Sequence, residues 1–281
     1  MPVFYLYKSR IYLHRQRSGN CVKITGRRWV LKNALLLNFC INMAFGGIIL
    51  LAENLKSVQE IINASLQKRK DSKLTGDSVT LVGVTKNHPP EVVAEALAQG
   101  INNIGENRVQ EAKAKREILG DGGYWHLIGH LQTNKVRQAV ALFDLIESID
   151  SEHLLQTVEK EAKRINKVQD VLLQLNIAHE EQKSGFSKEE YLSVLPLLNN
   201  YTHVKIRGLM VIAPKTDDME LVRDIFAAGY RCFCRLKMQR PDIDCLSMGM
   251  SGDYAIAVEE GANIVRVGTA LFGQRDYSLK F

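Results

Sequence analysis

The stretch VTLVGVTKNHPPEVVAEALAQG, residues 79–100, decides the fold. Its first seven residues, 79–85, are rich in β-branched side chains and carry no charge, which is typical of a buried strand. Residues 90–100 then predict a helix, with a proline at its start and a glycine at its end. A buried strand followed directly by a helix is the repeating unit of an α/β protein with a parallel sheet.

The same alternation of a β-rich run and a helical segment continues along the chain. Further strands are predicted at residues 103–106, 125–130, 145–149, 171–177, 204–212, 245–250 and 264–271. Eight parallel strands joined by right-handed crossovers fit a single (β/α)8 barrel, an architecture of about 250 residues. A doubly wound open sheet is the alternative, but no G-x-G-x-x-G sequence follows the first strand.

Composition and charge are those of an ordinary globular protein. The chain has 281 residues, of which 46% are hydrophobic and 24% charged. Its net charge of +6 comes from the first 52 residues, which hold eight of the 37 basic residues and none of the 31 acidic ones. Nucleic-acid binding is therefore not expected of the remainder. The five cysteines include no C-x-x-C pair, which indicates a reduced, cytoplasmic protein.

Residues 1–50 are expected to be an N-terminal extension that is first basic and then apolar. The uncharged run of residues 34–52 is near the length that spans a bilayer, so membrane contact is expected only if this run is native. An Arg-rich start without acidic residues also resembles a transit peptide, which makes a mitochondrial location the alternative. A third interpretation is an unstructured or non-native extension, with Met43 as the true first residue. The barrel is expected over residues 51–281.

A helix is predicted to begin near residue 51. Its apolar positions recur at steps of three and four residues, at Leu51, Leu55, Val58, Ile62 and Leu66. Because little chain follows the last predicted strand, an eighth outer helix has few residues from which to form. We expect the helix after residue 51 to cover that side of the barrel instead.

The active site of such a barrel lies at the carboxyl ends of its strands. Lys86 directly follows the first predicted strand, and its amine suits Schiff-base chemistry. A solvated loop lysine is the plainer interpretation of the same position. Asn107 follows the second predicted strand and offers a donor and an acceptor at the same rim.

The loops after the last two strands predict a phosphate site. Ser251 follows the seventh strand and precedes a helix, while Gly268 and Thr269 come at the end of the eighth. Hydroxyl groups and exposed backbone N–H groups bind anions, and these two loops form the usual phosphate site of the fold.

No metal site is predicted. His126 and His130 have the spacing of a helical metal pair, but they lie in a run that predicts a strand, where four residues span about 13 Å. Glu147 and Asp150 come at the end of the fourth strand, where carboxylates are common, and no role is assigned to them.

Several motifs carry a family resemblance, in this order: LVGVTK, IGENRVQE, HLIGHLQTNK, KSGF, IRGLMVI, LSMGMSGD and VRVGTALFG. With them, residues 51–275 resemble the pyridoxal phosphate homeostasis protein family. The resemblance implies a barrel like the N-terminal domain of alanine racemases, with pyridoxal 5′-phosphate (PLP) held as a Schiff base on Lys86. Gly83 and Thr85 depart from the family pattern, in which Ala and Ser are commoner.

The resemblance also implies roles for the other candidate residues. Ser251, Gly268 and Thr269 match phosphate contacts. Asn107 matches a residue beside the cofactor, and Arg266 matches the partner of the pyridine nitrogen. The implied function is to bind and buffer PLP and to hand it to PLP-dependent apoenzymes, without robust catalysis and so without catalytic residues. A closed barrel also favours a monomer.

Two other functions stay open at this point. A PLP-dependent amino-acid racemase would use Lys86 as one of two bases. A lyase without a cofactor would use Lys86 to attack a substrate carbonyl, and the anion loops would bind a sugar phosphate equally well.

Overall fold

The computed structural model describes residues 12–16, 19–24, 27–31, 34–69, 71, 74–178 and 184–274, and it describes those before Leu50 by their backbone alone. The chain divides into two compact units, Met1–Glu53 and Asn54–Phe281. The first unit contains an antiparallel sheet in the order β1-β2-β3. Its strands are β1 (Tyr12–Gln16), β2 (Gly19–Ile24) and β3 (Arg27–Leu31), and helix α1 (Ala34–Lys68) begins in this unit.

The expected N-terminal extension thus contains strands and part of a helix. The boundary after residue 50 and the non-native interpretation stay predictions. The side chains of residues 34–49 lie outside the described part of the chain. These residues are most of the uncharged run 34–52, for which membrane contact is expected only if the run is native. Among the described residues, no helix is both long enough and apolar enough to cross a membrane.

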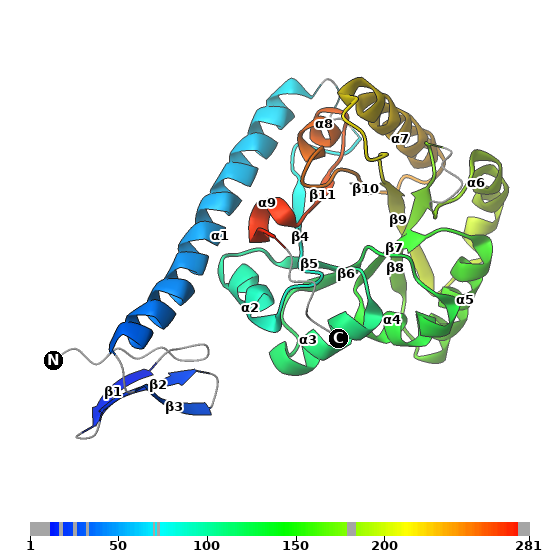
Figure 1. The fold of residues 1–281 in the computed structure, drawn as a ribbon. Helices are drawn as coiled ribbons and strands as arrows, with labels where there is room; N and C mark the ends of the chain where they lie inside the picture. The colour runs from blue at the N-terminus through cyan, green and yellow to red at the C-terminus, as the bar shows by residue number, and fades with distance from the viewer. Residues whose placement is uncertain are drawn as a thin grey trace. The chain divides into compact units, whose positions relative to one another are not determined.

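Eight parallel strands close a barrel in the second unit (Figure 1). They are β4 (Thr80–Val84), β5 (Asn103–Glu106), β6 (Tyr124–Leu127), β7 (Leu145–Ile149), β8 (Gln169–Leu175), β9 (Val204–Val211), β10 (Cys245–Ser247) and β11 (Ile264–Val267). Neighbours follow chain order, and β11 pairs back onto β4. Each predicted strand overlaps one of these, so the predicted (β/α)8 fold is confirmed.

Helices surround the strands (Figure 1). They are α2 (Pro90–Ala98), α3 (Val109–Leu119), α4 (Val136–Leu142), α5 (Glu152–Arg164), α6 (Lys188–Val194), α7 (Met219–Gln239), α8 (Tyr254–Glu259) and α9 (Thr269–Phe272), with 3-10 helices η1 (Thr133–Lys135) and η2 (Leu195–Asn200). Helix α2 begins at its proline and is followed by Gly100 with φ +85°, as the sequence predicts.

Three strands end three or four residues earlier than predicted. Strand β10 ends at Ser247 and not at residue 250, because Gly249 turns the chain with φ +89°. Strand β11 ends at Val267, and the residues after Gly268 form α9 and not strand. Strand β6 ends at Leu127, so His130 lies in the loop that follows it.

The part of α1 in the second unit packs where the sequence predicts it. Asn54 Nδ2 donates to the Leu271 carbonyl of α9 at 2.9 Å. Directly after α1, Arg69 Nε donates to the Val258 carbonyl at the end of α8 at 2.8 Å. This segment therefore covers the side of the barrel where only the four-residue helix α9 follows the last strand.

The interior of the barrel has an apolar layer and, next to it, a polar layer. The apolar layer consists of Val82, Leu145, Leu172, Met210 and Ile264, none more than 5% exposed. Two residues further along β7 and β11, on the same face of each strand, lie Glu147 and Arg266. The polar layer lies between the apolar core and the carboxyl ends of the strands.

Candidate functional site

Lys86 lies at the carboxyl end of β4. The strand pairing continues past Val84, because the Thr85 N–H donates to the Gly105 carbonyl at 3.1 Å. Side chains alternate along a strand, so Lys86 follows Val82 and Val84 on the face that lines the barrel. Its side chain is half-buried. Lys86 therefore lies at the rim, next to the barrel interior.

Gly83 in β4 and Thr85 directly after it, the two departures from the family pattern, both fit their surroundings. A Cβ atom at Gly83 would lie 2.9 Å from Ile101 Cγ2 and 3.1 Å from Phe272 Cζ, so Gly83 leaves room for side chains outside the barrel. Thr85 is buried, and its Oγ1 donates to Glu106 Oε1 at 2.6 Å. The hydroxyl group common to Thr and Ser is therefore used in this chain.

The two predicted phosphate loops meet at Ser251. Its Oγ accepts hydrogen bonds from the backbone N–H of Gly268 at 3.1 Å and of Ala270 at 3.4 Å. Both bonds use oxygen lone pairs, so the hydroxyl proton is left to donate to a bound anion. Thr269 is exposed and begins α9 beside these groups. The structure therefore brings Ser251, Gly268 and Thr269 together.

Gly268 connects the phosphate loop to the lysine strand. A Cβ atom at Gly268 would lie 3.2 Å from the Val84 carbonyl oxygen, a closer approach than most side chains tolerate. Val84 precedes Lys86 by two residues, and β11 pairs with β4 along Val267 and Gly83. The lysine and the anion-binding groups therefore lie on neighbouring strands at the same rim.

Arg266 lies inside the barrel, only 3% exposed, in a chain of polar side chains from four strands. Its Nη1 donates to Ser247 Oγ at 2.6 Å, and Ser247 Oγ in turn donates to Glu147 Oε2 at 2.6 Å. Nη2 donates to the Val211 carbonyl at 3.0 Å. On the other side of Glu147, His126 Nδ1 lies 2.6 Å from Glu147 Oε1. The guanidinium of Arg266 is therefore held in one orientation.

Burial and neighbouring charges change the pKa values of Glu147 and Arg266 in opposite directions. Burial alone would raise the pKa of Glu147, but the hydrogen bond and charge of His126, the charge of Arg266 and the Ser247 hydroxyl lower it below its ordinary value. Burial lowers the pKa of Arg266, while the carboxylates of Glu147 and Asp253 oppose that change. Glu147 therefore stays ionised and compensates the buried cation.

The roles of Glu147, His126 and Ser247 in this chain of polar side chains were not predicted. From the sequence alone, Glu147 had no assigned role and His126 was only half of a possible metal pair. The two histidines have separate partners, because His130 Nδ1 lies 2.8 Å from Asp150 Oδ2 in the loops. The available signal was the alternation within each strand, which places Glu147 two residues after the interior Leu145.

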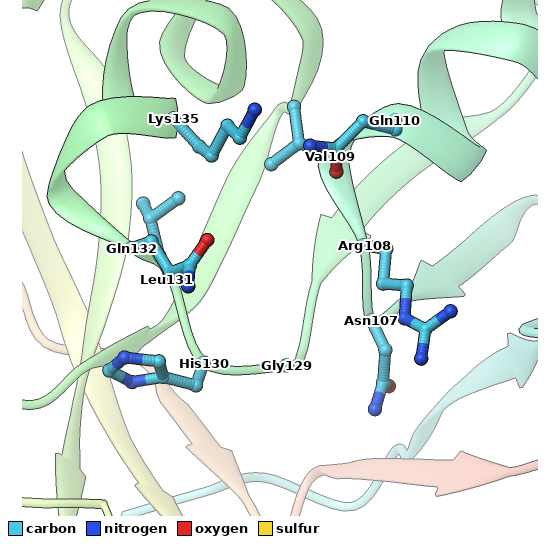
Figure 2. Close-up of a pocket in the computed structure, with 9 residues that line it drawn as sticks. All are labelled: Asn107, Arg108, Val109, Gln110, Gly129, His130, Leu131, Gln132 and Lys135. Atoms are coloured by element: carbon cyan, nitrogen blue, oxygen red, sulfur yellow. The ribbon is translucent and has the colours of Figure 1, made fainter. Parts of the chain in front are cut away.

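Asn107 follows β5 and lines a pocket of about 410 Å³ between the loops after β5 and β6 (Figure 2). Arg108 lies beside it, and Lys135 lies across the pocket. The two loops pack closely, because a Cβ atom at Gly129 would lie 2.4 Å from the Asn107 carbonyl oxygen. Asn107 is thus held at the rim next to β4, whose Val84 pairs with Gly105. Of the KSGF motif, Lys183 lies outside the described residues.

The converging groups define what the site can hold. An amine, a buried guanidinium and a set of hydroxyl and backbone N–H donors lie at the carboxyl ends of β10, β11 and β4, with an amide at β5. An amine forms a Schiff base with an aldehyde, hydroxyl and N–H donors bind phosphate, and a guanidinium donates to a ring nitrogen. This donor set fits PLP, the cofactor that the sequence resemblance implies.

Comparisons with known proteins agree with this geometry. The model of the family described as alanine racemase, N-terminal domain, matches residues 67–276. A pyridoxal phosphate homeostasis protein of Aquifex aeolicus is 42% identical over 70% of this chain and 87% of its own, and one of Pasteurella multocida is 36% identical over 80% and 98%. The structure of PipY of Synechococcus elongatus PCC7942 with PLP bound is 38% identical, covering 79% of this chain and 100% of its own, with a TM-score of 0.69.

Fold and site therefore define a lysine-bearing barrel of the alanine racemase N-terminal domain type. Within that class, the family follows from the two relatives, which are 36% and 42% identical and are matched over 98% and 87% of their own length. The chain belongs to the pyridoxal phosphate homeostasis protein family.

Proposed function

We propose that this protein binds PLP as a Schiff base on Lys86 and serves PLP homeostasis without robust catalysis. The observation that carries the proposal is the position of Lys86 next to the phosphate loop. Lys86 follows Val84 by two residues, and Gly268 of the phosphate loop lies close to the Val84 carbonyl oxygen. The names of the relatives and the PLP-bound structure of PipY support the same cofactor.

Lys86 would hold the cofactor covalently. PLP supplies an aldehyde, a phosphate and a pyridine ring. The Lys86 amine would hold the aldehyde carbon through a C=N bond, with the aldehyde oxygen released as water. Hydrolysis of that bond would release the aldehyde again, so the protein would be an exchangeable store of a reactive compound.

The loops after β10 and β11 would hold the phosphate. The Ser251 hydroxyl proton and the Thr269 hydroxyl are suitable donors, because phosphate accepts several charge-assisted hydrogen bonds. The backbone N–H groups of Gly268 and Ala270 donate to Ser251 Oγ and so hold that hydroxyl in place. Asn107 would lie beside the ring at the next strand end. These contacts orient the aldehyde toward Lys86.

Arg266 favours storage of PLP over PLP-dependent catalysis. A guanidinium donates hydrogen bonds and does not readily lose a proton, so a pyridine nitrogen paired with Arg266 stays unprotonated. An unprotonated ring withdraws electrons weakly and supports carbanion chemistry poorly. The racemase alternative therefore has less support than storage.

We also propose that the protein is monomeric and cytoplasmic and that it passes PLP to apoenzymes. A closed barrel has no unpaired strand edge that would need a second copy. Release by hydrolysis at Lys86 would let an apoenzyme with higher affinity take up the cofactor.

The test is the visible spectrum of the purified protein with PLP, before and after borohydride reduction. We expect a yellow band, reduction that fixes PLP to the Lys86 peptide, and loss of both in Lys86→Ala. Lys113→Ala is the matched control, because that lysine is 58% exposed on α3. A wild-type protein that stays colourless with PLP would refute the proposal. Exchange of an amino-acid α-proton with deuterium would favour the racemase.

A further inference from the structure

The turn that carries Lys86 is held on both sides by one helix. Lys115 Nζ on α3 donates to the Thr85 carbonyl at 2.7 Å, directly before Lys86. Glu111 Oε1, one turn earlier on α3, accepts the Asn87 N–H at 2.6 Å, directly after it. Lys86 therefore lies between two peptide groups that are both anchored by side chains of α3.

The two anchoring side chains belong to a buried charged cluster. Lys115 Nζ lies 2.8 Å from Glu111 Oε1 and 2.6 Å from Glu106 Oε1 of β5. All three side chains are at most 1% exposed. Ions removed from water are costly to bury, and apolar side chains of similar volume would fill the same space at lower cost. The cluster provides what apolar packing lacks, a fixed attachment for two backbone groups.

The backbone of this turn needs such an attachment. Asn87 has φ +58°, a left-handed conformation that most side chains disfavour and that Asn tolerates best. The His88 N–H closes the turn onto the Thr85 carbonyl at 3.0 Å. Without the carboxylate of Glu111, the Asn87 N–H would have to find water or another partner, and the turn would be free to open.

We propose that Glu111 and Lys115 are positioning residues that hold the Lys86 turn in its binding conformation before the cofactor arrives. The inference rests on the proposed function, since it concerns the amine that would bind PLP. Ordering one backbone residue on binding weakens affinity by about tenfold, and a turn ordered in advance avoids that loss.

Glu111→Met tests this better than Lys115→Met, which would leave two buried carboxylates without a cation. In Glu111→Met, Lys115 keeps Glu106 as its partner. We expect PLP affinity, read from the visible band, to fall about tenfold. Affinity for pyridoxine 5′-phosphate, which has the same ring and phosphate but no aldehyde, is expected to stay at the wild-type value.

Two further variants complete the set. Glu111→Gln keeps an oxygen that accepts the Asn87 N–H, and we expect it to restore the wild-type PLP affinity. Glu117→Met changes a glutamate that is 66% exposed on the same helix, and it should affect neither ligand.

The results for Glu111→Met can overturn the positioning role in two ways. If Glu111→Met lowers the affinity for PLP and for pyridoxine 5′-phosphate equally, the site is damaged in general and the proposal is overturned. A Glu111→Met variant that keeps the wild-type PLP affinity also overturns it. If the wild type forms no visible band, the proposed function fails instead. Hydrogen exchange of the wild-type protein needs no variant: an Asn87 amide that exchanges as fast as an exposed loop amide also overturns the positioning role.

Discussion

Glu147 Oε2 lies 3.8 Å from Arg266 Nη1 inside the barrel, and the Ser247 hydroxyl hydrogen-bonds to both side chains. The two residues are far apart in the sequence, on β7 and β11, and both are at most 3% exposed. Glu147 is thus the counter-charge of the arginine expected to face the pyridine nitrogen.

Glu147→Gln leaves the Arg266 cation buried without its compensating charge. We expect the free energy of unfolding to fall by about 3 kcal/mol, because the remaining charge keeps its desolvation cost. Urea unfolding measures the change, with Glu117→Gln on the surface of α3 as the control. An unchanged unfolding free energy would show that Arg266 does not depend on Glu147.

Ser251→Ala removes the acceptor for the Gly268 and Ala270 N–H groups and one donor for a bound phosphate. We expect PLP affinity to fall about tenfold, the value of one charge-assisted hydrogen bond. Fluorescence or absorbance titration measures it. The control is Ser187→Ala, which removes the capping box of α6 and should cost about 1 kcal/mol of stability without changing PLP affinity. Equal affinities in both variants would exclude a phosphate role for Ser251.

Gly129→Ala would place a Cβ atom 2.4 Å from the carbonyl oxygen of Asn107 and 2.8 Å from its Cα, so the loop after β5 has to move. We expect a loss of about 2 kcal/mol of stability, typical of overpacking, and a weaker PLP affinity. Gly122→Ala, before the amino end of β6, is the matched control, because a Cβ atom there meets only the end of a flexible side chain, Leu97 Cδ1, at 3.3 Å. Unfolding curves and PLP titrations of the two variants should differ clearly; identical behaviour would contradict the close packing of the two loops.

Glu106 makes stability depend on pH. Burial raises the pKa of Glu106 from 4.5 to about 7, although the charge of Lys115 opposes the rise and that of Glu111 adds to it. Between these two values the folded protein keeps a proton that the unfolded chain has released, so the contribution of Glu106 to stability falls as pH rises. Glu106→Gln should therefore make the slope of unfolding free energy against pH more positive between pH 4.5 and about 7. Parallel curves for variant and wild type would contradict the raised pKa.

Much of the fold could be predicted, because strand and helix each leave a local pattern. The run at 79–85 carries no charge and is rich in β-branched residues, which is enough to indicate a buried strand, and β4 lies within it. The errors occur at strand ends. Gly249 ends β10 with φ +89°, and helix α9 begins directly after Gly268, the residue that follows β11.

The sequence by itself determined the barrel and the place of Lys86, Ser251 and Gly268 on one rim. Parallel strands all end at the same side, so the residue after each strand is placed once the strands are known. Only the tertiary structure decided which residues support them. Glu147 meets Arg266, and Lys115 meets the Lys86 turn, because closure of the barrel and packing of α3 bring distant residues together. A buried helical lysine has the same local sequence pattern as a solvated one, since burial is a property of the surroundings and not of the segment.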